Sequence, residues 1–270
     1  MTDAAAPPGA VLDAFGVHHE PSPLATPTWL AGDVVLKPDT DPSLQAWLGT
    51  EVARVVRDGF RLAEPLPAAD GSWVVQGWSA SRWVAGASVP TTVPSAERWR
   101  QALEGGRAFH RAVSHLDRPA FVDGRDSWWA RADRRAWGES GPVHPVPPLA
   151  ATARLLEAAC RPLGEPQVVH ADLGGNVLLA GGLDPAVIDV SPYWRPTPYA
   201  EGVLVADALC WHGAEPTLLD ELGVSVPAVA RAMLFRLWTT HERVLAGVRP
   251  DELAVEALAY ADAAAAIGLG

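Results

Sequence analysis

The sequence predicts an α+β protein of two lobes: a small, β-rich N-terminal lobe with one helix and a larger, mostly helical C-terminal lobe. Extended segments separated by turn residues dominate up to about Gly86, whereas apolar residues at helical spacing dominate from Ser95 onward. With 270 residues, 49% of them hydrophobic, the chain is long enough to bury a substantial core. We expect lobes of residues 1–86 and 87–270, with WVAG at 83–86 as the hinge.

The N-terminal lobe is predicted from turn and capping signals. WLAGDVVLKP at 29–38 predicts a turn followed by a strand that ends at Lys37, because Pro38 favours an extended residue before it. Asp41-Pro42 is typical of a helix start, and apolar spacing extends that helix to about Gly59. Asp70-Gly71 indicates a hairpin turn between extended segments.

Glu51 falls on or beside the apolar face of this predicted helix, where an unpaired carboxylate is costly. The natural partner is Lys37 on the preceding strand. Of the 21 basic residues, Lys37 is the only lysine, so a chain that otherwise uses arginine keeps a lysine there.

The C-terminal lobe is predicted to be helical, with one strand-like segment at 168–190. The predicted helices cover about 95–116, 125–138, 149–161, 201–211, 226–246 and 251–266.

The strand-like segment, VVHADLGGNVLLAGGLDPAVIDV, carries the polar residues that point to chemistry. NVLLA and PAVID form two strands joined by the turn GGLD, and pairing Ala180 with Pro185 sets Asn176 opposite Asp189. Asp172 lies in the loop just before them. Carboxylate and amide oxygens of this kind suit Mg²⁺, which completes its octahedron with water and phosphate.

The motif H-x-D, then Asn176, then a hydrophobic strand, a turn and I-D, with a Lys strand and a Glu helix upstream, resembles the protein-kinase-like superfamily. The resemblance is to its aminoglycoside and choline phosphotransferase branch and covers most of the chain. It implies a bilobal kinase-like fold with a nucleotide-binding N-terminal lobe and a catalytic, acceptor-binding C-terminal lobe.

The resemblance also implies a role for each matching residue. Asp172 corresponds to the catalytic base, and Asn176 and Asp189 to the Mg²⁺ ligands. Lys37 corresponds to the residue that holds the α- and β-phosphates of ATP, and Glu51 to the one that orients it. His170 braces the catalytic loop, and Asp207, in VADAL at 205–209, anchors it.

These roles predict a cytoplasmic enzyme that uses ATP and Mg²⁺ to phosphorylate a hydroxyl of a small molecule of the aminoglycoside, sugar or amino-alcohol type. An alternative is a nucleotide-binding pseudokinase or regulatory module. It is favoured by the lack of G-x-G-x-x-G before the Lys37 strand, and by an Asp172 to Asn176 spacing of four where the superfamily has five. A metal-dependent hydrolase would leave Lys37 and Glu51 unexplained.

Composition limits the partners. A net charge of −11 argues against nucleic acid, which needs a concentrated basic surface, and is compatible with a cationic substrate. No apolar run reaches the length of a membrane span and no secretory leader pattern is present, so we expect neither membrane insertion nor secretion. The two cysteines predict reduced thiols. The oligomeric state is left open.

Overall fold

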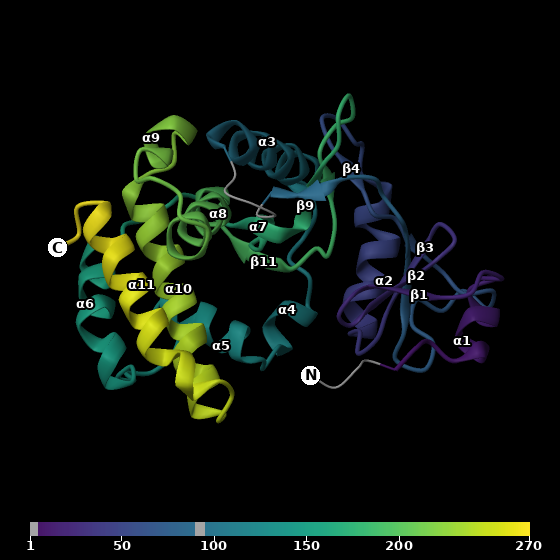
Figure 1. Ribbon diagram of the computed structural model, residues 1–270, viewed down its shortest axis with the longest axis horizontal. Helices are drawn as coiled ribbons and strands as arrows, with labels where there is room; N and C mark the ends of the chain where they lie inside the picture. Colours follow the sequence, from purple (N-terminus) through teal and green to yellow (C-terminus); the bar gives the residue numbers. More distant parts are fainter. Residues whose placement is uncertain (1–4, 90–94) are drawn as a thin grey trace.

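The computed structural model describes residues 5–89 and 95–270 and has the predicted two-lobed α+β architecture. Figure 1 shows the strands of the N-terminal lobe at one end of the molecule and the helices of the C-terminal lobe at the other, with a few strands between them. Among the described residues no helix is long and apolar enough to cross a membrane.

The N-terminal lobe is built on a five-stranded antiparallel sheet of order β1-β2-β3-β6-β5. Its strands are β1 (Ser22–Ala25), β2 (Thr28–Ala31), β3 (Val34–Lys37), β5 (Pro65–Leu66) and β6 (Ser79–Arg82). Val34 and Leu36 of β3 are buried against α1 (Gly9–Ala14) and β6, and their alternation with Lys37 leaves the lysine partly exposed. The predicted turn and strand at 29–38 are therefore confirmed.

Helix α2 (Pro42–Thr50) begins where the sequence predicts it to begin. The Asp41 carboxylate accepts hydrogen bonds from the backbone N–H groups of Ser43 (2.9 Å) and Leu44 (3.4 Å). The predicted end near Gly59 is wrong, because the helix stops at Thr50 and gives way to the 3₁₀ turn η1 (Val52–Arg54). This turn directs Val52 into a core that the N-terminal segment shares with the C-terminal lobe.

The shared core lies beside a four-stranded sheet of order β4-β10-β9-β7. Its strands are β4 (Arg61–Leu62), β7 (Ala87–Ser88), β9 (Val177–Leu179) and β10 (Ala186–Val187). Strand β4, early in the sequence, pairs in parallel with β10, so it lies beside strands of the C-terminal lobe. The buried residues of this core are Leu48, Val52, Val55, Phe60, Leu62, Ala108, Phe109, Val113, Val168, Val187 and Val190. Burial of this apolar surface links the two lobes.

The segment 83–86 connects β6 of the first sheet with β7 of the second, which is the position predicted for the hinge. The division at residue 86 stays a prediction. Residues between 48 and 62 precede that division in sequence, but their buried side chains pack with residues that follow it.

The predicted helices of the C-terminal lobe are all present, with shifted ends. The lobe contains α3 (Ala96–Val113), α4 (Phe121–Gly124), α5 (Trp128–Ala136), η3 (Pro147–Leu149), α6 (Ala150–Ala159), α7 (Leu173–Asn176), α8 (Thr197–Trp211), α9 (Leu218–Leu222), α10 (Val226–Leu245), η4 (Pro250–Glu252) and α11 (Leu253–Ala266). Helices α8 and α10 form the centre of its core, and Figure 1 shows α10 between α8 and α11.

The prediction of a single strand-like segment in this lobe is wrong. Strand β11 (Pro192–Arg195) pairs antiparallel with β8 (Gln167–His170), so that Pro192 lies opposite His170 and Tyr193 opposite Val169. A proline at the first residue of a strand is a tolerated position, because no ladder hydrogen bond is lost there.

The predicted register of the β9–β10 hairpin is wrong by one residue. Val177 pairs with Val187 and Leu178 with Ala186, and the N–H of Ile188 donates to the Asn176 carbonyl at 2.9 Å. Asn176 therefore lies opposite Ile188, with Asp189 one residue farther along. The pairing of β10 with β4 on its other edge and the burial of Val187 fix this register.

We predict that Gly202→Ala lowers the free energy of unfolding by about 1–3 kcal/mol, because a Cβ there overlaps the backbone of Ala228 where α8 crosses α10. Urea denaturation of the purified variant measures the change. Gly124→Ala, with nothing within 4 Å of its added Cβ, is the control and is expected to stay within about 0.5 kcal/mol of the wild type. Equal stabilities for the two variants would contradict this close approach.

Candidate active site

A cleft of about 1180 Å³ lies between the lobes and contains most of the predicted site residues. Lys37 lines it from the N-terminal lobe, and Asp172, Asn176 and Asp189 line it from the C-terminal lobe. A second hollow, of about 790 Å³, lies between α3 and the β9–β10 turn and contains none of them.

His170, at the end of β8, is fully buried and joins the loop to the chain around Asp189. Its Nδ1 accepts from the Ser191 N–H at 3.2 Å, and its Nε2 lies 3.2 Å from the Ile188 carbonyl oxygen, which assigns the proton to Nε2. Burial lowers the pKa of His170, so the ring is neutral. The ring thus connects β8 with the chain at 188–191, and the bracing role of His170 stays a prediction.

Asp172 lies between β8 and α7, and 44% of its side chain is exposed, so its carboxylate is open to the cleft. Oδ1 accepts from Nη2 of Arg236 at 2.7 Å, and Oδ2 accepts from the Asn176 amide at 3.1 Å. Partial burial would raise the pKa of Asp172, but the charge and hydrogen bond of Arg236 outweigh it and hold this pKa below its ordinary value. The carboxylate is therefore ionised at neutral pH.

Arg236 is a central site residue that the sequence interpretation missed. It projects from α10, and its Nε donates to Oδ1 of Asp207 on α8 at 2.8 Å while its Nη2 bonds both Asp207 and Asp172. Asp207 thus holds the loop indirectly, through the guanidinium. The sequence signal was a lone arginine inside the apolar run AMLFRLW at 232–238, which predicts a buried, paired cation.

Lys37 and Asp189 meet directly across the cleft, with Nζ 2.9 Å from Oδ2. Asp189 has a φ of 46°, a left-handed conformation that few non-glycine residues adopt. The predicted ion pair between Lys37 and Glu51 is not formed. Because α2 ends at Thr50, Glu51 becomes its C-terminal cap residue and is exposed, without an ion-pair partner among the described residues.

The donor set fits one hard divalent cation. The amide nitrogen of Asn176 is engaged by Asp172, which leaves its Oδ1 as a neutral oxygen donor, and the Asp189 carboxylate lines the same cleft. No three His, Cys, Asp or Glu side chains form a metal-binding group in the described parts of the chain. Two protein oxygens are what Mg²⁺ uses when phosphates and water supply the rest of its coordination.

No protein-family model matches the chain, and no curated protein matches its sequence. Solved structures do match its fold. The aminoglycoside phosphotransferase from Alicyclobacillus acidocaldarius has a TM-score of 0.61 and 15% identity over 98% of this chain and 94% of that one. A choline/ethanolamine kinase family protein from Mesorhizobium loti has a TM-score of 0.58 and 19% identity over 94% and 90%.

A third match is spectinomycin phosphotransferase in complex with ADP and spectinomycin, with a TM-score of 0.51 and 11% identity over 89% of this chain and 83% of that one. The chain therefore has the same two-lobed fold as these phosphotransferase and choline/ethanolamine kinase structures, which is the fold that its motifs predicted. Similarity at these identities establishes the fold and leaves the activity to the site.

The buried His110 of α3 predicts acid sensitivity. Its Nε2 accepts from the His170 backbone N–H at 3.0 Å. Burial, followed by the repulsion that two protonated rings of His110 and His170 would experience, lowers the pKa of His110 from 6.5 to about 3. Below pH 6.5 the His110 side chain becomes protonated in the unfolded chain, whereas it stays neutral in the folded protein down to about pH 3. Stability from this residue is therefore complete above pH 6.5 and falls by up to about 1.4 kcal/mol per pH unit toward pH 3.

Urea denaturation at a series of pH values from 7 to 4 measures this slope. His110→Gln keeps an acceptor but cannot take up the proton, so we expect a shallower loss of stability than in the wild type. Identical slopes for the two proteins would contradict the assignment.

Proposed function

We propose that the protein is an ATP- and Mg²⁺-dependent phosphotransferase that phosphorylates a hydroxyl of a small molecule. The observation that carries this proposal is the ionised Asp172 carboxylate, open to a cleft that also holds Lys37 and the oxygens of Asn176 and Asp189. The matched structures support it, since they include an aminoglycoside phosphotransferase and a spectinomycin phosphotransferase in complex with ADP.

In this mechanism Asp172 accepts the proton of the acceptor hydroxyl. The hydroxyl oxygen forms a bond to the γ-phosphorus of ATP, and the bond from that phosphorus to the β–γ bridging oxygen breaks. ADP leaves with the electron pair of that bond. Arg236 and Asn176 keep the Asp172 carboxylate ionised and oriented toward the cleft.

Lys37 has three N–H donors on a cation, which suits the α- and β-phosphates of the nucleotide. Asp189 and Asn176 would hold Mg²⁺, and the ion would supply neutralisation of phosphate charge. Glu51 does not contact Lys37, and the ion pair with Asp189 orients the lysine instead.

The N-terminal lobe offers few phosphate contacts. The turn between β1 and β2 has no glycine-rich sequence, and Leu24, Ala25 and Thr28 line the cleft at this place. This feature favours the second candidate, a nucleotide-binding module that does not transfer phosphate.

Calorimetric titration with a non-hydrolysable ATP analogue, with and without Mg²⁺, tests the nucleotide site. Mg²⁺-dependent binding followed by acceptor-dependent ADP release supports the phosphotransferase. Binding without release under any acceptor supports the non-catalytic module, and no binding contradicts both.

We predict that Asp172→Asn lowers turnover by roughly 10²-fold or more, because the amide cannot accept the hydroxyl proton while it keeps the size of the side chain. ATP affinity is expected to stay unchanged, and titration with the analogue checks it. Wild-type turnover in this variant would remove Asp172 as the base.

We predict that Arg236→Lys moves the acidic limb of the kcat/KM profile to higher pH. A lysine keeps the charge but cannot bond Asp172 and Asp207 in the same fork geometry, so the pKa of Asp172 rises and its ionised form appears at higher pH. A pH series of kcat/KM measures the shift, with thermal unfolding as the check of folding. A lower rate with an unmoved acidic limb would show that Arg236 is only structural.

A further inference from the structure

Four basic side chains of the described residues line the cleft: Lys37, Arg82, Arg125 and Arg236. Three of them have a carboxylate within ion-pair distance, and these pairs are Lys37–Asp189, Arg82–Asp33 and Arg236 with Asp172 and Asp207. Arg125 is the exception, with no carboxylate partner among the described residues. A partly buried cation without a counter-ion is unfavourable unless a ligand supplies the negative charge.

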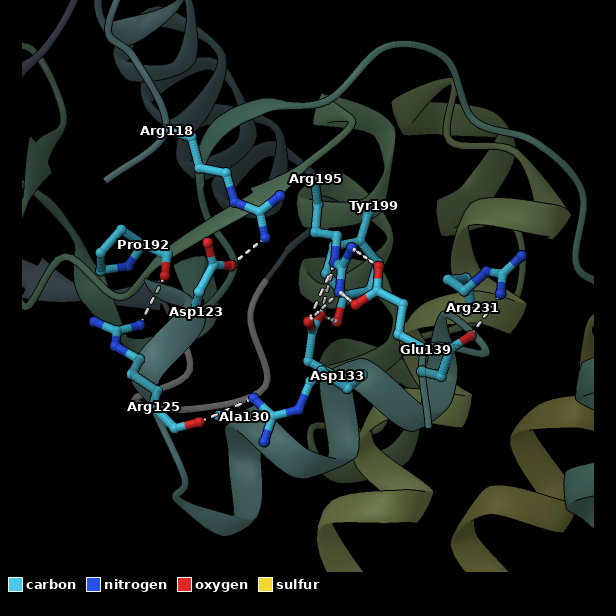
Figure 2. Close-up of polar contacts among 12 residues, drawn as sticks. Arg118, Asp123, Arg125, Ala130, Asp133, Glu139, Pro192, Arg195, Tyr199 and Arg231 are labelled. Carbon is cyan, nitrogen blue, oxygen red and sulfur yellow. Dashed lines mark hydrogen bonds and ion pairs between the residues drawn. The ribbon is translucent and has the colours of Figure 1, made fainter. Parts of the chain in front are cut away.

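Arg125 is nevertheless held in place, immediately after α4. Its Nη1 donates to the Pro192 carbonyl at 2.8 Å, its guanidinium lies 5.1 Å from the centre of the Phe121 ring, and its own carbonyl accepts from Arg134 at 2.9 Å. Figure 2 shows one amino nitrogen of Arg125 directed at Pro192 and the other directed away from that contact. Burial lowers the pKa of Arg125, although the group remains a cation.

The acidic residues nearby are engaged elsewhere or lie on the other lobe. Asp126 pairs with Arg131 at 3.3 Å and with Arg134 at 3.6 Å. Asp41 of the N-terminal lobe, whose charge acts to raise the pKa of Arg125, makes no ion pair with it; it caps α2 and is exposed. Asp39 also lines the cleft but is exposed beside Lys37.

Tyr193 supplies a second polar group without a partner. Only 8% of the residue is exposed, it lines the cleft, and no described residue hydrogen-bonds its hydroxyl. Burial and the charge of Asp133 raise its pKa, so the phenol remains a hydrogen-bond donor. Arg125 donates to the carbonyl of Pro192, the residue directly before Tyr193. The Arg125 guanidinium and the Tyr193 side chain therefore lie at the same end of β11.

This end of β11 is next to the proposed base, since Pro192 lies opposite His170, two residues before Asp172. The strand is fixed on α5 by Arg195, whose guanidinium binds the buried Asp133 at 2.7 Å and Glu139 at 2.6 Å (Figure 2). Trp129 of α5, 46% exposed, completes the wall of the cleft on this side with an apolar face.

We propose that Arg125, Tyr193 and Trp129 form the acceptor subsite, and that the acceptor is a hydroxyl compound carrying an anionic oxygen group, either a carboxylate or a phosphate ester. The inference rests on the proposed phosphotransferase and specifies its substrate class. Arg125 binds the anionic group, a task suited to its planar fork of donors. Tyr193 donates to an oxygen of the acceptor between Arg125 and Asp172, and Trp129 packs against its carbon chain.

Four polyols with the same carbon chain test the charge preference: gluconate, sorbitol 6-phosphate, sorbitol and 1-amino-1-deoxysorbitol. Calorimetric titration of the full chain measures the affinity for each compound, and ADP release with Mg·ATP measures kcat/KM. We expect gluconate or sorbitol 6-phosphate to bind at least about tenfold more tightly than sorbitol, and the amine to bind most weakly. The tighter of the two anions identifies the carboxylate or the phosphate as the recognised group.

Arg125→Gln is expected to remove this preference, with a loss of at least about tenfold in affinity for the anion and little change for sorbitol. Arg125→Lys keeps the positive charge and should therefore keep part of the preference for the anion over sorbitol. Arg118→Gln is the matched control, because it removes the same charge from an exposed residue that pairs with Asp123 outside the cleft (Figure 2). Thermal unfolding establishes that each variant is folded.

The outcomes separate the two proposals. If the amine binds most tightly, if neither anion binds, or if Arg125→Gln binds anions as the wild type does, the subsite assignment is overturned while Mg·ATP binding and phosphate transfer stand. If the ATP analogue does not bind but anion binding depends on Arg125, the phosphotransferase proposal fails and the anion subsite stands.

Discussion

The geometry of the site depends on the ion pairs of Arg236 with Asp172 and Asp207. The arginine side chain is 15% exposed and lies between Asp207 on α8 and Asp172 in the loop after β8, so one cation joins two central helices to this loop. Removing one partner of such a buried group typically costs about 3–5 kcal/mol, because it leaves the remaining charge unpaired. The same contact holds the pKa of Asp172 low, so helix packing and the ionisation of the proposed base have a common cause.

The shared apolar core positions Asp189 on the opposite wall of the cleft, as Arg236 positions Asp172. Val52 and Leu62 from the N-terminal part of the chain pack with Val187 and Val190, which flank Asp189 in sequence. Packing on both sides of Asp189 over-determines its backbone, which sustains its left-handed conformation and aims the carboxylate at Lys37. The two cleft walls are therefore positioned by buried contacts that lie outside the cleft itself.

Net charge is a poor guide to what this cleft binds. The chain carries −11 overall, which favours cationic partners at long range, yet the cation of Arg125 is the one cleft-lining basic group of the described chain without a carboxylate partner. Local pairing decides recognition at contact distance, since Asp172, Asp189 and Asp126 are each neutralised by a neighbouring base. The fold that the chain shares with solved structures at 15% and 19% identity does not by itself fix which side chains line this side of the cleft.

The sequence by itself determined the two-lobed α+β class, the strand ending at Lys37, the helix start at Asp41 and the loop and hairpin carrying Asp172, Asn176 and Asp189. These follow from local signals such as turn residues, caps and alternation, which act within a few positions of the chain. Only the tertiary structure decided the one-residue register of the hairpin, the early end of α2 that exposes Glu51, and the pairing of Lys37 with Asp189. It also decided the roles of Arg236 and Arg125, because the partners of a charged side chain come from segments distant in sequence, brought together when the apolar cores form.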